Sequence, residues 1–121
     1  MTTLNETLHP GAFLVSESPG FLSRSVATIP AGVEVRVGMV LGKLTAGGSQ
    51  PMLPAASDGS QKAAQIAIYP MAAAATGSRK IAVIDMDAEV RASDLEWPAG
   101  ISDADKATAT AQLLALGIKL R

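Results

Sequence analysis

The side chains best suited to chemistry are five oxygen-bearing residues gathered in one short stretch. They take the first, third, fifth, ninth and twelfth positions of a calcium-binding loop: Asp85, Asp87, Glu89, Ser93 and Glu96. Such a loop needs glycine at its sixth position and a helix on each side, whereas Val90 stands sixth here and a β-branched stretch precedes the register. The pattern therefore favours acidic residues on the exposed face of a strand, and we expect no bound metal.

Two further patterns resemble functional motifs but lack a necessary part. Residues 38–43 read GMVLGK, with three residues between the glycines and a leucine after the lysine. A phosphate-binding loop needs four residues there, and Ser or Thr after the lysine. Asp103 and Asp105 have the types of an acid and a base, but at the start of a helix their charges suit the cap and the helix dipole. We therefore expect turn and capping roles for both patterns.

The rest of the composition excludes most familiar enzymes. The chain has no cysteine, and His9 is its one histidine. This rules out a thiolate nucleophile, a cysteine zinc site and a histidine triad in the domain interior. Chemistry at Asp85 and Asp87 stays open as a weak alternative, because no acid or base partner accompanies them. We expect a protein that is not an enzyme and binds no cofactor.

Length and charge narrow the class further. The 121 residues suffice for one domain, and a formal net charge of -1 without any basic cluster argues against nucleic acid as a partner. No apolar run reaches the roughly 18 residues of a membrane span, and the first residues lack the pattern of a secretory signal, so we expect synthesis in the cytosol. Aromatic residues make up only 3% of the chain, and a core of small aliphatic side chains gains from burial shared between copies.

The elements that hold these residues are predicted to be mainly strands. Apolar and polar residues alternate, or apolar residues run together, in several segments bounded by turn residues. The predicted strands are residues 26–29, 33–37, 39–45, 64–69, 79–86 and 118–121. Gly42 predicts a bulge or a close backbone approach, and the apolar stretch 79–86 predicts an interior strand.

One helix is predicted near the C-terminus. Ser102 is a suitable N-cap with Asp105 three residues later, and Gly117 suits the left-handed position that ends a helix. Helical spacing produces an apolar stripe that we expect to pack on a sheet: Ala104, Ala107, Ala111, Leu114 and Ala115. The fold class is therefore mainly β with one C-terminal helix.

The first 25 residues differ from the rest and are predicted to be an extended N-terminal arm, followed by a β-rich domain at 26–121. Prolines and glycines interrupt this stretch, yet it holds two of the four aromatic residues of the chain. We expect its exposed side chains to bind a partner surface: Phe13, Leu14, Val15, Phe21, Leu22 and Arg24. The alternative is an ordinary first strand that caps the domain's own core.

Several short strings, in this order and spacing, resemble the lambda-type head decoration proteins of bacteriophages. They lie at residues 13–17, 23–24, 38–43, 54–60, 88–90, 95–101 and 116–121. The resemblance implies a β-clip-like fold, a homotrimer at the three-fold and quasi-three-fold positions of an icosahedral head, and an arm that orders on the major capsid protein. It also implies a virion protein on the outer capsid surface that stabilises the expanded head against DNA pressure. The first 30 residues depart most from the family, so arm contacts are not transferred residue by residue.

A different class of function remains as the alternative. Short strands interrupted by glycine, such as those between residues 33 and 44, also occur in sugar-binding and lipoyl-type carrier domains. A carrier needs a displayed lysine, and Lys43 lies inside a predicted strand without the methionine neighbour that such a site has. Trp97 has the type of a ligand platform, but a tryptophan beside a proline more often packs structurally.

Overall fold

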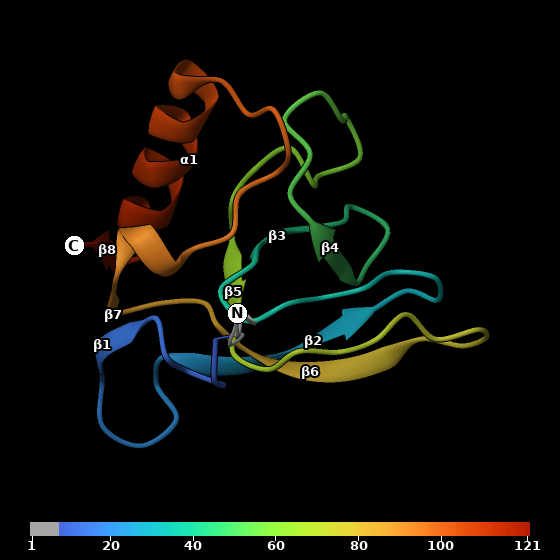
Figure 1. Cartoon of the computed structure of the whole chain (residues 1–121), viewed down its shortest axis with the longest axis horizontal. Helices are drawn as coiled ribbons and strands as arrows, with labels where there is room; N and C mark the ends of the chain where they lie inside the picture. Colours follow the sequence, from blue (N-terminus) through green and yellow to red (C-terminus); the bar gives the residue numbers. More distant parts are fainter. Residues whose placement is uncertain (1–7) are drawn as a thin grey trace, which may run out of the picture.

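A computed structural model describes residues 8–121 and shows two β-sheets and one α-helix (Figure 1). The mainly β class with one C-terminal helix is confirmed for this part of the chain. The first strands are β1 (Leu14–Glu17), β2 (Arg24–Ile29), β3 (Val40–Lys43), β4 (Ser49–Pro51) and β5 (Gln65–Ala67). They are followed by β6 (Arg79–Ile84), β7 (Ala88–Val90), a short 3₁₀ turn η1 (Ala92–Asp94), α1 (Asp103–Ala115) and β8 (Ile118–Leu120).

The larger sheet has the order β2-β6-β5-β3-β4, with all neighbours antiparallel. The apolar strand β6 is interior, as the sequence predicts. The sheet curls until its two edge strands approach each other, since a Cβ added at Gly48 beside β4 would lie 3.0 Å from the carbonyl oxygen of Thr28 in β2. This curl encloses a core without large aromatic side chains.

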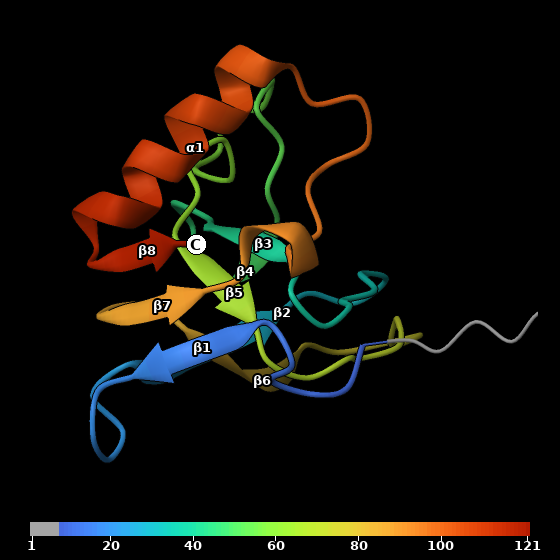
Figure 2. The ribbon, with the colours of Figure 1, turned by 60° about the vertical axis from the view of Figure 1, so that its left-hand side comes forward.

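The smaller sheet has the order β1-β7-β8. β1 pairs antiparallel with β7, and β7 pairs parallel with β8, which follows the helix (Figure 2). The register between β1 and β7 shifts between Leu14 and Ser16, as in a β-bulge. β1 is therefore an ordered edge strand of the chain's own sheet.

Two apolar clusters form the core. The first lies between the two sheets and α1, and its members include Phe13, Ile66, Val90 and Leu113. The second lies inside the curl of the larger sheet and includes Leu41 and Val83. Aliphatic side chains dominate both clusters, as the composition predicts, and Phe13 is the one fully buried aromatic residue within 8–121.

The helix begins as predicted. The Ser102 side chain accepts a hydrogen bond from the backbone N–H of Asp105, and Gly117 has φ +86° just beyond the helix. The predicted buried stripe is wrong, because all five of its members are exposed and the buried residues are Ala109 and Leu113. The helix packs against the core through Ala109 and Leu113 instead.

The strand predicted at residues 33–37 does not form. Their burial alternates as expected, with Val35 and Val37 buried, yet Val35 forms only an isolated bridge with Met71. Gly42 does make the predicted close approach, since a Cβ there would lie 2.6 Å from the Cα and carbonyl oxygen of Ser60. Gly42 is thus fixed by packing against another loop.

Candidate functional site

The N-terminal segment contributes both buried and exposed side chains. Phe13 is 0% exposed and lies in the first core cluster, and half-buried Leu14 packs against that cluster. The backbone N–H of Arg91 donates to the carbonyl of Phe13 at 2.7 Å, and the N–H of Gly11 donates to the carbonyl of Ile68 at 3.1 Å. Phe13 and Leu14 are thus parts of the core in this structure, in agreement with the alternative reading of this segment as a first strand.

Arg24 is held by an ion pair within the segment. Its guanidinium donates two hydrogen bonds to the carboxylate of Glu17, both at 2.8 Å. This bidentate pair lowers the pKa of Glu17, and the side-chain hydrogen bond from Arg24 is the main cause. The end of β1 is therefore joined to the start of β2, and Arg24 is not a free cation.

The loop at residues 18–23 is fastened at its base by Ser23. This buried hydroxyl donates to the carbonyl of Asp87 at 2.7 Å and accepts from the backbone N–H of Ser18 at 2.9 Å. The backbone N–H of Asp85 donates to the carbonyl of Ser23 at 3.0 Å. These bonds fix both ends of the loop against the turn between β6 and β7.

The tip of the same loop carries exposed apolar side chains. Phe21 is 87% exposed and Leu22 is 66% exposed, while Val15 on β1 is 50% exposed. Figures 1 and 2 show this loop extending from the ends of β1 and β2. Phe21 and Leu22 are neighbouring exposed apolar side chains, which makes this loop a candidate interaction surface. We name Val15, Phe21 and Leu22 the apolar tip.

Two further exposed apolar residues lie on the segments next to the base of this loop. Met86 is in the turn that binds Ser23, and Leu116 follows the helix. The backbone N–H of Asp87 donates to the carbonyl of Leu116 at 3.2 Å, which joins the helix end to that turn. Hydrogen bonds thus connect the base of the loop, through this turn, to the segment that follows α1.

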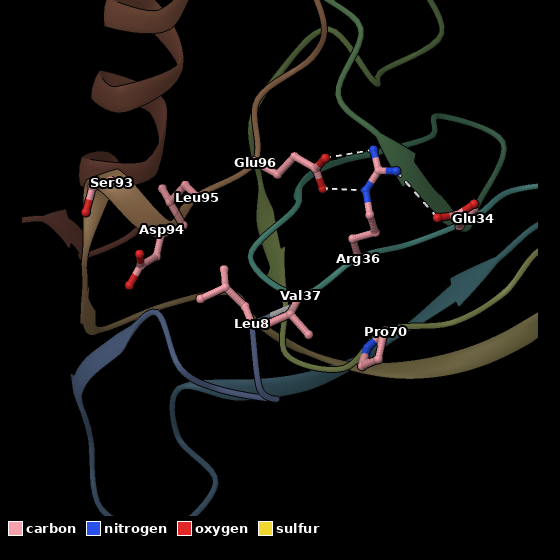
Figure 3. Close-up of a pocket in the computed structure, with 9 residues that line it drawn as sticks. All are labelled: Leu8, Glu34, Arg36, Val37, Pro70, Ser93, Asp94, Leu95 and Glu96. Carbon is pink, nitrogen blue, oxygen red and sulfur yellow. Dashed lines mark hydrogen bonds and ion pairs between the residues drawn. The ribbon is translucent and has the colours of Figure 1, made fainter. Parts of the chain in front are cut away.

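A separate hollow of about 580 Å³ lies between Leu8 and the segment before Trp97 (Figure 3). Apolar side chains line part of it, among them Val37, Pro70 and Leu95. Its polar wall is the guanidinium of Arg36, which binds Glu96 at 2.7 Å and Glu34 at 3.5 Å. The hydrogen bond from Arg36 to Glu96 raises the pKa of the guanidinium.

The carboxylates of the calcium-loop register point to different partners. Asp85 accepts a hydrogen bond from the hydroxyl of Ser25 at 2.6 Å, Glu89 binds Arg121 at 2.9 Å, and Glu96 binds Arg36. Among residues 8–121, no three His, Asp or Glu side chains come together in a way that could hold a metal ion. The register therefore belongs to a strand and its flanking turns.

Trp97 packs against the first core cluster, and the ammonium of Lys106 lies 5.5 Å from the centre of its ring. This contact is a cation–π interaction between the helix and the segment before it. Lys43, the lysine that a carrier would display, is the exposed last residue of β3 and pairs with Ser49 in the ladder. Trp97 thus packs structurally, and Lys43 belongs to a strand through its backbone.

A comparison with protein families gives the assignment that geometry alone does not. The family model of the bacteriophage lambda head decoration protein D matches residues 3–118, nearly the whole chain. The chain belongs to this family. Its members are structural proteins that decorate phage heads, so this chain is a head protein that associates with the capsid. A search of curated proteins found no match. No helix within residues 8–121 is long and apolar enough to cross a membrane.

Sequence reasoning did not predict the hydrogen bonds that hold the base of the loop at residues 18–23. Glu17 and Ser23 belong to the strings that carry the family resemblance, but no contact was predicted for them, although a serine beside Arg24 and an acid before the Pro19–Gly20 turn were visible signals. The hollow at Leu8 was also missed, because its walls come from segments far apart in the sequence. Of the six residues predicted to bind a partner, Phe13 and Leu14 pack in or against the core and Arg24 is paired with Glu17. The other three, which form the apolar tip, are exposed. Residues 1–7 of the predicted arm lie outside the described residues.

Proposed function

We propose that this protein cements the expanded phage head from outside. Three copies bind at each three-fold and quasi-three-fold position, contact the major capsid protein and hold adjacent capsomers against internal DNA pressure. The family match supports this role, and the near-zero net charge fits a protein partner better than nucleic acid. In this proposal the protein is made in the host cytoplasm, joins the virion at its surface and works by occupancy rather than by turnover.

We assign the capsid contact to the N-terminal 25 residues and, among the described ones, to the apolar tip. Phe21 offers an aromatic ring on a loop whose base is already fixed, and Leu22 on this loop and Val15 on β1 are further exposed apolar side chains. Burial of such a side chain contributes roughly 1.5–3 kcal/mol. Phe13 and β1 anchor this surface to the domain, so they act on binding only through the fold.

Three copies in one trimer bind the capsid more strongly than a single apolar tip would. A trimer that places three tips against neighbouring capsomers turns the second and third contacts into intramolecular ones, which increases avidity well beyond the affinity of one tip. The exposed edge of β1 offers backbone groups for pairing with a capsid strand as a further contact. Weak individual contacts are therefore sufficient for stable decoration.

The test is co-sedimentation of the purified protein with expanded empty heads of its phage. The unaltered protein should saturate the heads, and Phe21→Ala should weaken binding at least about tenfold, as expected for a lost ring. Val26→Ala is the matched control, because Val26 is similarly exposed on β2 outside the loop. Both variants should melt like the unaltered protein.

Two outcomes would contradict the proposal at different levels. Failure of the unaltered protein to sediment with heads would remove the cement function. If Phe21→Ala and the double variant Phe21→Ala, Leu22→Ala both bind heads normally, the cement function stands. The capsid contact then belongs to another surface of the protein.

A further inference from the structure

A groove runs across the face of the molecule that carries the segment between η1 and α1. The hollow of Figure 3 shares Glu34, Arg36 and Glu96 with a second hollow, and the second shares Leu53, Pro98 and Ala99 with a third. The three hollows therefore adjoin one another along this face, and together they are called the groove. Its floor is largely apolar, with Val37, Met39, Leu53 and Trp97 among the lining residues.

The middle of this groove carries an unbalanced negative charge. The carboxylates of Glu34 and Glu96 share the single guanidinium of Arg36, and the contact to Glu34 is the longer one at 3.5 Å. Glu34 is exposed, so its charge remains available to a partner. Asp94 in the same lining is already paired with Arg91 at 3.0 Å. An occupant should thus be apolar and should bring a cation to the side of Glu34.

The chain itself displays a segment with these properties. Residues 72–78 form an uncharged, alanine-rich loop that is mostly exposed, and it leads into Arg79 and Lys80 at the start of β6. These are the chain's one adjacent pair of basic residues. Within residues 8–121 neither side chain has an ion-pair partner.

The loop extends away from the groove of its own copy. In Figure 1 it projects beyond the ends of β2 and β6, on the side of the molecule away from α1. Its base runs beside residues 32–35, since Gly32 N–H donates to the carbonyl of Ala74 at 2.9 Å and Met71 N–H donates to the carbonyl of Val35 at 2.7 Å. Arg79 and Lys80 also pair through their backbones with β2, which keeps them at the edge of the molecule.

We propose that the occupant of the groove is a second copy of this chain, with the loop 72–78 and Lys80 of one copy seated against Glu34 and the apolar floor of the next. Groove and loop are different surfaces, so the contact is heterologous, and a three-fold rotation closes it into a ring of three. The inference rests on the proposed trimer and names the surface that holds it together. It leaves the apolar tip free to bind the capsid.

The first measurement is sedimentation velocity of the free protein over a concentration series up to the millimolar range. Lys80→Glu should weaken self-association roughly tenfold, and Glu34→Lys should do the same, because each places like charges across the contact. The double variant Lys80→Glu, Glu34→Lys should restore association. Lys62→Glu is the matched control, since Lys62 is an exposed lysine outside all three hollows.

The second measurement is zero-length carbodiimide coupling, which joins an amine and a carboxylate in contact, followed by peptide mass spectrometry. A link between Lys80 and Glu34 of different copies is expected in the free protein at high concentration and on decorated heads. Association that Lys80→Glu and Glu34→Lys leave unchanged would overturn the proposal while the trimer stands. A link from Glu34 to the capsid protein would assign the groove to that partner. Monomers at every concentration, with no link between copies on heads, would overturn both the contact and the proposed trimer.

Discussion

Phe13 and Phe21 are eight positions apart and chemically identical, yet the structure gives them opposite environments. Replacing each with alanine should therefore produce opposite results. Phe13 is 0% exposed in the core cluster shared by both sheets and the helix. Truncating such a ring costs about 3–5 kcal/mol. A domain of this size has about 5–15 kcal/mol of total stability, so Phe13→Ala removes a large part of it.

The expected change in melting temperature follows from that free energy. For a domain of this length, 1 kcal/mol shifts the melting temperature by roughly 4 °C, so Phe13→Ala should lower it by roughly 10–20 °C. Phe21 is 87% exposed, and its replacement should change stability by no more than about 0.5 kcal/mol. Thermal unfolding followed by circular dichroism measures both variants, and guanidinium titration provides the free energies.

Capsid binding completes the comparison. Phe21→Ala should bind heads weakly although it is fully folded, whereas Phe13→Ala should bind normally at temperatures where it stays folded. If Phe13→Ala melts like the unaltered protein but loses capsid binding, Phe13 is a contact residue and the assignment of β1 to the domain is refuted.

Three further results are expected. Deleting residues 1–22 should unfold the domain or lower its melting temperature strongly in calorimetry, because the deletion removes Phe13 and β1. Glu17→Gln should reduce stability by about 0.5–1 kcal/mol at pH 7 in denaturant titrations. Arg24 lowers the pKa of Glu17, so this stabilisation is present above the unfolded pKa of about 4.3 and is lost as pH falls through the folded value; a difference that persists at pH 2 would contradict it. Gly42→Ala should cost about 1–3 kcal/mol, because its Cβ would lie 2.6 Å from backbone atoms of Ser60; unchanged stability would show that this loop yields.

The helix shows what local sequence can and cannot predict. Ser102 and Gly117 act through their own backbone neighbours, so the start and end of the helix could be predicted. The buried face could not be predicted, because four of the five alanines of α1 share one face at helical spacing, whereas the buried Ala109 and Leu113 lie on roughly the opposite face. The face that packs on the domain is set by contacts with remote segments, among them the hydrogen bond that the side chain of Gln112 accepts from the backbone N–H of Ala63 at 2.8 Å.

The strands show the same division. Alternation at residues 33–37 correctly predicted which side chains are buried, but the strand predicted there forms only one isolated bridge, because a ladder needs a neighbouring strand at the right distance. In the N-terminal segment, composition predicted an interaction surface without separating Phe13 from Phe21. Their difference arises from β7, whose pairing with β1 places one ring in the core, and β7 is remote in the sequence.

The fastened loop changes the energetic argument for capsid binding. A disordered arm must offset an ordering cost of roughly 1–2 kcal/mol per residue before it contributes affinity. Residues 18–23 avoid much of that cost, because Ser23 and the Glu17–Arg24 pair already hold the base of the loop in the free chain. Burial of Phe21 and Leu22 therefore contributes to affinity more directly than the same residues would on a free arm. It follows that loosening the base should weaken capsid binding even when the apolar tip is intact. Ser23→Ala tests this, because it removes the hydrogen bonds to Asp87 and Ser18 while leaving Phe21 in place. Its head binding should fall by more than its loss of stability explains, and binding equal to that of the unaltered protein would show that the preformed loop contributes nothing.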